Sequence, residues 1–421
     1  MTEIGEIPEE WDADKISTLK ESMYYGVTAK ATEKNTNMRF LRTTDIINFK
    51  FTPSELPFCK ITEKRSALSK CYLKKNDIIV ARAGTVGVSV LVKEDLKDTL
   101  FGSYLIKITL NQEKANMSFV HYYFQSQPYW NKLSSAQGGT IKNINLPFLG
   151  SLVIPVPPLP EQQKIAEILT TADRKIELVD HEIQVAEKLK KGLMQTLLTR
   201  GIGHTKFKLT EIGEIPEEWV IKSIDECNIP TRNMDPTLVF GKGEFEYIDV
   251  SGISPERLRI VETKRMRGID APSRARREVR EDDILFATIR PYLKRIGKVP
   301  KNLDGNVCST AFCVIRANQN LILSDFLYYS VASNNFVNKV SGLQTGSAYP
   351  AVSYNQVLSE KIALPALIEQ KKISEILIRV DEKLELLRKK KIESETLKKG
   401  LMQILLTGLV RVKINSSRSE N

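Results

Sequence analysis

A long apolar seam runs through residues 161–199, where apolar side chains recur at alternating steps of four and three residues. Its members are Ile165, Leu169, Ala172, Ile176, Val179, Ile183 and Ala186, followed after a skipped turn by Leu193 and Leu197. This spacing keeps one stripe of an α-helix apolar and predicts a coiled coil. The seam stops before Gly201. A helix of roughly 38 residues would be about 57 Å long.

A second seam of the same phase lies 208 positions further along the chain. It comprises Ile373, Leu377, Val380, Leu384 and Leu387, and Leu401 and Leu405 close it. A helix with one apolar stripe needs a partner surface, so we expect the two helices to pair. The chain enters a second globular segment at the far end of the first helix, and the second helix follows that segment. The pairing is therefore expected to be antiparallel.

Polar residues interrupt the second seam. Lys391, Ser394 and Lys398 stand where apolar residues are expected, and in an antiparallel pair they would lie near Glu177, Asp180 and Asp173. Charged pairs at such positions can fix the register of a coiled coil at some cost in stability. The alternative is that this part of the helix is solvated or contacts another protein.

The whole chain is a tandem duplication. Residues 2–11 recur without change as residues 210–219, with the same offset of 208 that relates the two helices. The pattern predicts an α+β fold with pseudo-twofold symmetry, in which two globular α/β domains alternate with two long helices that pair as an antiparallel coiled coil. The expected boundaries are a globular domain at 1–155, a helical spacer at 156–205, a second globular domain at 206–363 and a second helical spacer at 364–421.

Within the globular segments, short apolar runs predict strands at 77–82, 86–92, 105–110 and 283–287. The stretch 119–130 is more helical in pattern, and 326–340 matches it in the second copy. Gly138 and Gly139 begin a loop in which the backbone can approach another group closely. Prolines at 155, 157, 158 and 160, and Pro365 in the second copy, end the preceding element and stiffen the exit into each long helix.

Composition excludes several classes of protein. The chain has 421 residues, 42% of them apolar and 27% charged, which is typical of a globular protein with two or three cores. It contains no membrane span or signal peptide, so we expect a cytoplasmic protein. Five cysteines without CxxC spacing and three scattered histidines argue against zinc and disulfides. The net charge of +11 favours an acidic partner such as nucleic acid.

The motifs that carry catalysis are absent from the sequence. There is no phosphate-binding Gly-x-x-x-x-Gly-Lys-Ser/Thr loop, no complete Gly-x-Gly-x-x-Gly, no Asn/Asp-Pro-Pro-Tyr segment and no Pro-Asp followed by Glu-x-Lys. No catalytic residue, metal ligand or cofactor site is therefore predicted in this chain.

Basic residues are the informative class. They gather among glycine, proline and strand residues between 257 and 301, with a looser group in the first globular segment. Guanidinium groups on loops can contact DNA phosphates and can hydrogen-bond to the edges of guanine bases. The candidate DNA-binding residues are Arg39, Arg42, Lys64, Arg65, Arg82, Thr140 and Lys142 in the first globular segment, and Arg265, Arg267, Arg274, Arg276, Arg277, Arg290, Tyr292, Lys294, Arg295 and Tyr349 in the second.

These features together resemble the specificity (S) subunits of type I restriction-modification enzymes. The motifs that carry the resemblance are the doubled Glu-Ile-Gly-Glu-Ile-Pro-Glu-Glu-Trp, the run Pro-Pro-Leu-Pro-Glu-Gln-Gln-Lys-Ile at 157–165, Lys-Gly-Leu-Met-Gln at 191–195 with Leu-Leu-Thr at 197–199, and Leu-Thr-Gly at 406–408. Arg-Pro-Tyr-Leu at 290–293, after the strand at 283–287, also looks like the target-recognition domains of this family.

The resemblance implies a non-catalytic, DNA-binding subunit. Each globular segment would be a target-recognition domain that reads one half of a bipartite DNA site, and the coiled coil would set the spacing. Double-stranded DNA, methyltransferase (M) subunits, two of them, and restriction (R) subunits would be the partners. S-adenosylmethionine, ATP and Mg would bind to those partner subunits.

Two other interpretations stay open at this point. The chain could be a coiled-coil scaffold whose basic domains bind an acidic protein, or an enzyme with an unrecognised site. The sequence does not give the recognised bases, since readout depends on which side chains reach which groove.

Overall fold

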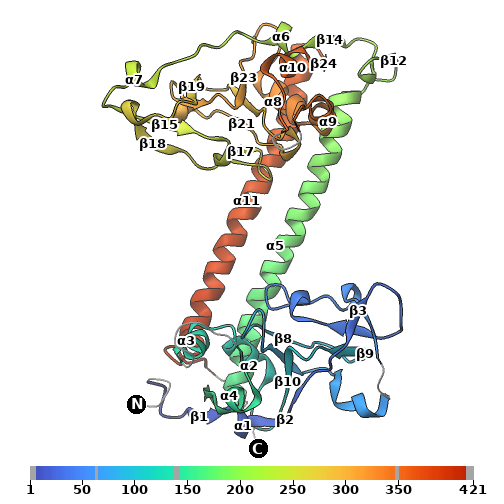
Figure 1. Ribbon diagram of the computed structural model, residues 1–421, viewed down its shortest axis with the longest axis vertical. Helices are drawn as coiled ribbons and strands as arrows, with labels where there is room; N and C mark the ends of the chain where they lie inside the picture. Colours follow the sequence, from blue (N-terminus) through green and yellow to red (C-terminus); the bar gives the residue numbers. More distant parts are fainter. Residues whose placement is uncertain (1–5, 62–64, 136–142, 347–349, 414–421) are drawn as a thin grey trace, which may run out of the picture. The chain divides into compact units, whose positions relative to one another are not determined.

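The computed structural model describes residues 6–61, 65–135, 143–346 and 350–413 (Figure 1). The chain divides into two compact units. Unit 1 comprises Met1–Asp180 and Lys389–Asn421, and unit 2 comprises His181–Arg388. Each long helix therefore gives one of its halves to each unit, and the pairing of the helices is described separately in unit 1 and in unit 2.

The two predicted helices are present as α5 (Leu159–Arg200) and α11 (Leu367–Leu405), of 42 and 39 residues. Glycines with left-handed backbone follow both helices, Gly201 with φ +65° and Gly408 with φ +76°. A Cβ atom at Gly201 would lie 2.7 Å from the ring of Trp219, and one at Gly408 would lie 2.6 Å from Cγ of Pro8. Both turns therefore require glycine.

The helices pair antiparallel in each unit. In unit 1, Nζ of Lys391 lies 2.6 Å from a carboxylate oxygen of Asp180, and Nζ of Lys398 lies 2.7 Å from one of Asp173. Residue numbers thus rise along α5 as they fall along α11, which confirms the predicted direction and two of the predicted neighbours of the polar seam residues. Ser394 is buried, and its hydroxyl donates to a carbonyl of its own helix.

A polar cluster, which we term the Tyr–Asp–Lys cluster, occurs once in each unit. Its members are Tyr122, Asp173 and Lys398 in unit 1, and their repeat counterparts Tyr329, Asp381 and Lys190 in unit 2. In both copies the tyrosine hydroxyl donates to the aspartate over 2.8 Å, and the lysine lies 2.7 Å from that carboxylate in unit 1 and 2.6 Å in unit 2. The cluster thus joins three parts of each unit: the globular domain, one long helix and the other long helix.

The apolar seam is largely buried, as predicted. Ile165, Leu169, Val179, Ile373, Leu377, Leu384 and Leu387 are buried, and Ile176 and Ile183 are half-buried. The first seam residues of each helix pack into the core of a globular domain, so that the seam serves both the helix pair and the domain from which the helix leaves.

Unit 1 is built on a four-stranded and a five-stranded sheet. The first has the order β2 (Lys20–Tyr25), β10 (Leu105–Leu110), β7 (Ile78–Ala81) and β8 (Ser89–Leu91), and the second has the order β3 (Lys30–Thr32), β5 (Phe58–Lys60), β4 (Arg39–Leu41), β9 (Leu96–Phe101) and β6 (Tyr72–Leu73). Strand β1 (Asp12–Lys15) pairs with β11 (Val153–Val156), and the helices are α1 (Ile16–Leu19), α2 (Met117–Tyr123), α3 (Gln127–Ser135) and α4 (Leu146–Ser151).

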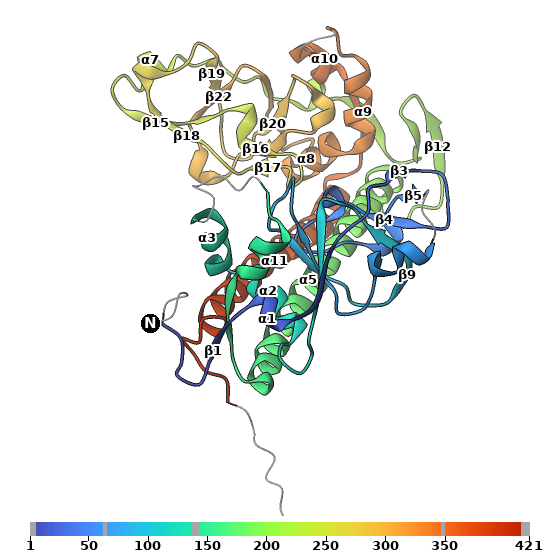
Figure 2. The same cartoon turned by 60° about the horizontal axis from the view of Figure 1, so that its bottom comes forward.

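Unit 2 repeats this plan with changed details. Its sheets are β21 (Ile296–Lys298), β20 (Ile284–Ala287) and β23 (Phe312–Ile315); β18 (Lys264–Arg267), β15 (Glu244–Ile248), β22 (Val307–Ser309) and β19 (Ala275–Glu278); and the pairs β14 (Val220–Ser223) with β24 (Lys361–Leu364), β12 (Phe207–Thr210) with β13 (Gly213–Pro216), and β16 (Ile253–Ser254) with β17 (Arg259–Ile260). The helices are α6 (Ile224–Cys227), α7 (Pro236–Val239), α8 (Ser324–Ala332), α9 (Asn334–Gly342) and α10 (Tyr354–Ser359). Figures 1 and 2 both show α7 beside β15 and β18, with α9 and α10 grouped apart from them.

The stretch 119–130, which the sequence indicated to be helical, forms two helices, α2 and α3, in place of one. Pro128 lacks the N–H that a continuous helix would need, so it lies in the first turn of a new helix. In unit 2 the counterpart also divides, at Ser333, whose hydroxyl accepts from the N–H of Phe336 and caps α9.

Two side chains at the start of each long helix form hydrogen bonds to the globular domain that precedes the helix. Glu161 accepts from the indole N–H of Trp11 over 3.1 Å, and its counterpart Glu369 accepts from Trp219 over 3.0 Å. Amide nitrogens of the next residues, Gln162 and Gln370, donate to the carbonyls of a hinge proline, at 2.8 and 2.9 Å. The repeated Glu-Gln dipeptide therefore anchors both helices in the same way.

His121 on α2 makes the stability of unit 1 depend on pH. Burial, and to a smaller extent the ammonium of Lys398, lower the pKa of His121 to about 3 in the folded protein from an ordinary 6.5. The unfolded chain therefore binds this proton at a higher pH than the folded chain does. Stability is fully present above about pH 6.5 and is lost as the pH falls, by up to about 1.4 kcal/mol per pH unit.

We expect the His121→Gln variant to be less stable than the parent at pH 7, because the hydrogen bond between Ser89 and the imidazole is lost. We also expect the variant to lose less stability than the parent between pH 7 and pH 5. Urea denaturation at a series of pH values measures both quantities. The variant His181→Gln, at an exposed position of α5, serves as the control and should keep the parent slope. Parallel pH curves for the parent and His121→Gln would contradict this assignment.

Candidate nucleic-acid interface

Three of the predicted arginines of unit 2 are exposed but paired. Arg265 lies 2.6 Å from Glu244, Arg267 lies 2.8 Å from Asp270, and Arg274 lies 3.0 Å from Asp249. Each would have to exchange a carboxylate for a phosphate or a base in order to bind DNA. Such exposed pairs contribute little to stability, so they do not prevent the exchange.

Three other predicted arginines face the protein. Arg276 donates to a carbonyl of β19, and the guanidinium of Arg277 lies 4.8 Å from the ring centre of Tyr354. Nη1 of Arg295 lies 2.8–3.3 Å from the carbonyl oxygens of Val250, Ser251 and Ile253. These contacts position backbone and strands, and they give the three side chains a structural role.

Residues 289–293, which we term the tip, lie in the connection between β20 and β21. Ile289, Arg290, Tyr292 and Leu293 are exposed there, and among the described residues Arg290 has no ion pair or hydrogen bond to its guanidinium. Two non-glycine residues border the turn with left-handed backbone, Arg290 with φ 49° and Lys294 with φ 52°. Each such conformation costs about 1–2 kcal/mol, and strain of this kind is concentrated at functional sites.

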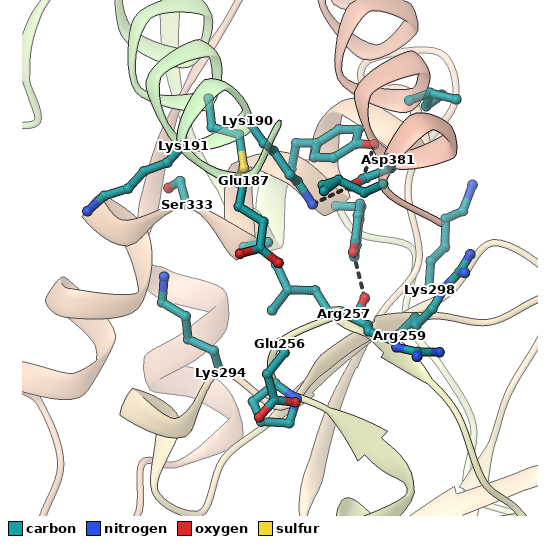
Figure 3. A pocket seen from close by; sticks show the side chains of 18 of the residues that line it. Glu187, Lys190, Lys191, Glu256, Arg257, Arg259, Lys294, Lys298, Ser333 and Asp381 are labelled. Carbon is teal, nitrogen blue, oxygen red and sulfur yellow. Dashed lines mark hydrogen bonds and ion pairs between the residues drawn. The ribbon is translucent and has the colours of Figure 1, made fainter. Parts of the chain in front are cut away.

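Lys294 tethers the tip to the wall of a pocket of about 1650 Å³ (Figure 3). Its ammonium is hydrogen-bonded to the side chain of Asn334, and burial together with the nearby ammonium of Lys191 lowers its pKa. The predicted residue Lys294 therefore holds the tip in place, and its charge is only partly available to a ligand.

The pocket itself is lined by acids and bases that neutralise one another. Lys190 pairs with Asp381 at 2.6 Å, and Arg259 pairs with Glu385 at 2.9 Å. Arg388 lies 2.9 Å from both Glu187 and Glu385 (Figure 3 labels several of these residues). This lining does not offer the uniformly basic surface that a DNA backbone prefers.

In unit 1, three of the predicted arginines contact the protein itself. Arg39 donates to the carbonyl of Leu56, and Arg42 pairs with Asp45 at 2.7 Å, so both hold the chain. Arg82 lies with its guanidinium 4.6 Å from the ring centre of Tyr25 and donates to the carbonyl of Ile144. Arg65 begins the 3-10 helix η3 (Arg65–Cys71). The remaining candidates, Lys64, Thr140, Lys142 and Tyr349, lie outside the described residues.

Sequence reasoning missed two residues near these surfaces. Tyr25 supports Arg82, but no local pattern links a tyrosine on β2 to an arginine that follows β7. Arg232 is exposed and has no ion pair among the described residues, and it was missed because it stands alone, well before the basic cluster. No group of three or more His, Cys, Asp or Glu side chains that could hold a metal ion occurs in the described parts of the chain. Nor does any helix of those parts have the length and apolarity to cross a bilayer.

Comparison with known proteins gives concordant results. The family described as "Type I restriction modification DNA specificity domain" matches the chain twice, at residues 8–188 and 206–396. The MjaVIII type I restriction enzyme specificity subunit of Methanocaldococcus jannaschii is 30% identical over 85% of this chain and 83% of its own length. A putative specificity subunit of the same organism, MjaX, is 28% identical over 98% of this chain and 96% of its own.

A solved structure shares the fold. The crystal structure of the S subunit of a type I restriction-modification system from M. genitalium aligns with 98% of this chain and 99% of its own, at a TM-score of 0.57 and 16% identity. The repeated plan of two domains and two long helices is therefore also that of a known protein.

The contacts of Arg295 and Arg265 predict losses of stability of different size for the same substitution. Arg295→Ala leaves the carbonyls of residues 250, 251 and 253 without their shared donor, and we expect unit 2 to lose about 1–3 kcal/mol. Arg265→Ala removes only an exposed pair with Glu244, so we expect a change below about 1 kcal/mol. Urea denaturation measures both, and equal losses would show that Arg295 does not hold this loop.

Proposed function

The chain belongs to the family of type I restriction-modification DNA specificity domains, and from this premise we propose that it gives a type I restriction-modification complex its DNA sequence specificity. The observation that carries the proposal is that one chain holds two copies of the specificity domain, each with its own core and its own set of cations.

Two different domains in one chain suit a bipartite DNA site. The framework repeats closely, through the Tyr–Asp–Lys cluster and the Trp–Glu contacts. The contacts of the predicted arginines differ between the units, as with Arg82 on Tyr25 in unit 1 and Arg265 with Glu244 in unit 2. A shared framework with different surfaces would let each target-recognition domain read its own half-site. The helices α5 and α11 would then set the number of unspecified base pairs between the half-sites.

The chain would perform no chemistry itself. We expect methyltransferase (M) subunits, two of them, to bring S-adenosylmethionine, and restriction (R) subunits to bring ATP and Mg. The relatives are named specificity subunits, which supports this division of labour. Such a complex would act on cellular DNA, in the cytoplasm.

The long helices offer a surface for the methyltransferase subunits. Leu178 and Leu189 of α5 are 65% and 53% exposed, and their repeat counterparts on α11, Leu386 and Leu397, are 61% and 55% exposed. Their recurrence at the same positions of both repeats is the reason for proposing them as part of a protein-binding surface. Because the positions occur once per repeat, they suit two copies of one partner.

The function is tested by base-resolved methylation maps of host DNA with and without the gene for this chain. We expect methyladenine at one bipartite motif to disappear when the gene is deleted and to return when it is restored. If no motif depends on the gene although the methyltransferase subunit is produced, the proposal fails, and a scaffold that binds an acidic protein becomes the better interpretation.

The docking surface predicts a separate effect. The double variant Leu189→Asp with Leu397→Asp should lose co-purification with the methyltransferase subunit, because two carboxylates would enter an apolar contact. The matched control is Lys188→Asp with Thr396→Asp, the preceding exposed residue in each repeat. It introduces the same side chains about a quarter-turn away. Both proteins should keep the parent melting temperature, and equal co-purification of the two variants would place the contact elsewhere.

A further inference from the structure

Among the described residues of the predicted surface of unit 2, the tip combines a free guanidinium with strained backbone. Arg290 is exposed and has no polar partner for its side chain in the described chain, in contrast to the paired Arg265, Arg267 and Arg274. Its left-handed backbone (φ 49°, ψ 59°) is one that an arginine rarely adopts. The chain thus keeps an unfavourable residue at a position where glycine would fit better.

Contacts from distant segments hold the tip rigidly. The N–H of Arg290 donates to the carbonyl of Pro350 over 2.8 Å, and Ile289 forms an antiparallel bridge with Ala351. On the other side, the side chain of Lys294 is held by Asn334, and that of Arg295 by three carbonyls. A rigid support of this kind keeps a recognition side chain in position before the ligand binds.

The chemistry of the tip suits a base edge. A guanidinium presents two parallel N–H groups, which match O6 and N7 of guanine in the major groove, and on a rigid support these groups are held at a fixed angle. Tyr292 and Leu293 are 49% and 41% exposed beside it and provide apolar area for the neighbouring sugar or thymine methyl.

From these observations we propose that Arg290 reads a guanine in the half-site recognised by unit 2, with Tyr292 and Leu293 packed against the adjoining nucleotide. This inference rests on the proposed function of the chain. It assigns one specificity-determining residue and one base type to one of the two target-recognition domains.

The test uses the full chain together with its methyltransferase subunit, and the readout is the base-resolved methyladenine map of the host DNA. Arg290→Lys keeps the charge but removes the paired N–H groups. We expect one guanine of one half-site to become degenerate, with discrimination at that position reduced about 5- to 150-fold, and the other half-site and the spacer to stay unchanged. The matched control Arg200→Lys, the same change at an exposed arginine at the end of α5 that pairs with Glu214 and is not a candidate DNA-binding residue, should keep the parent map.

A second variant separates recognition from folding. Arg290→Gly removes the side chain and relieves the left-handed backbone, so its melting temperature should equal or exceed that of the parent while the same guanine becomes degenerate. Degeneracy at this position in both variants supports the inference.

Two results overturn the inference and leave the proposed function intact. One is an unchanged map in the Arg290 variants. The other is a uniform loss of methylation at all sites with no degenerate position, which would make Arg290 a phosphate contact. A parent chain that directs no bipartite methylation at all would instead overturn the proposed function, and this inference with it.

Discussion

The hydrogen bond and ion pair at one aspartate per repeat hold the rest of the fold in place. Asp173 accepts from Tyr122 of the globular domain and pairs with Lys398 of the opposing helix, and Asp381 does the same in unit 2 with Tyr329 and Lys190. Apolar seams alone tolerate shifts by a heptad, because leucine packs against leucine in either position. A carboxylate that binds two partners from different elements does not tolerate such a shift, because the shift would break both contacts. The cluster therefore fixes the register of each helix pair and the docking of each domain together.

Much of this framework could be predicted from the sequence, because its determinants are periodic or repeated. The seam gave the helices, and the offset between the repeats with an antiparallel direction was enough to place Lys391 near Asp180 and Lys398 near Asp173. The availability of the arginines could not be predicted. Whether Arg265 is neutralised depends on Glu244, which is 21 residues away on a neighbouring strand, and only the register of that sheet brings the two together.

The two units show how one framework can carry two surfaces. Residues that hold the long helices keep their identity, as with Trp11 and Trp219 or Gln162 and Gln370. Residues in the turn that follows the buried strand, β7 in unit 1 and β20 in unit 2, differ between the units. Unit 1 has Arg82 stacked on Tyr25, whereas unit 2 has Arg290 with strained backbone. Since the turn is supported from outside by other segments, its sequence can change with little effect on the core. A new DNA specificity can then arise without a new fold.

The division of the chain has a consequence for its synthesis on the ribosome. Unit 2 is continuous in sequence, but unit 1 needs the last part of the chain, where Leu405 and Leu406 join its core and Arg411 pairs with Glu161 at 2.7 Å. The part of the unit 1 core that binds Leu405 and Leu406 therefore stays uncovered while about two hundred further residues are translated, at about 5–20 residues per second. The domain whose strands are made first is completed late, and loss of residues 405–411 would remove part of its core.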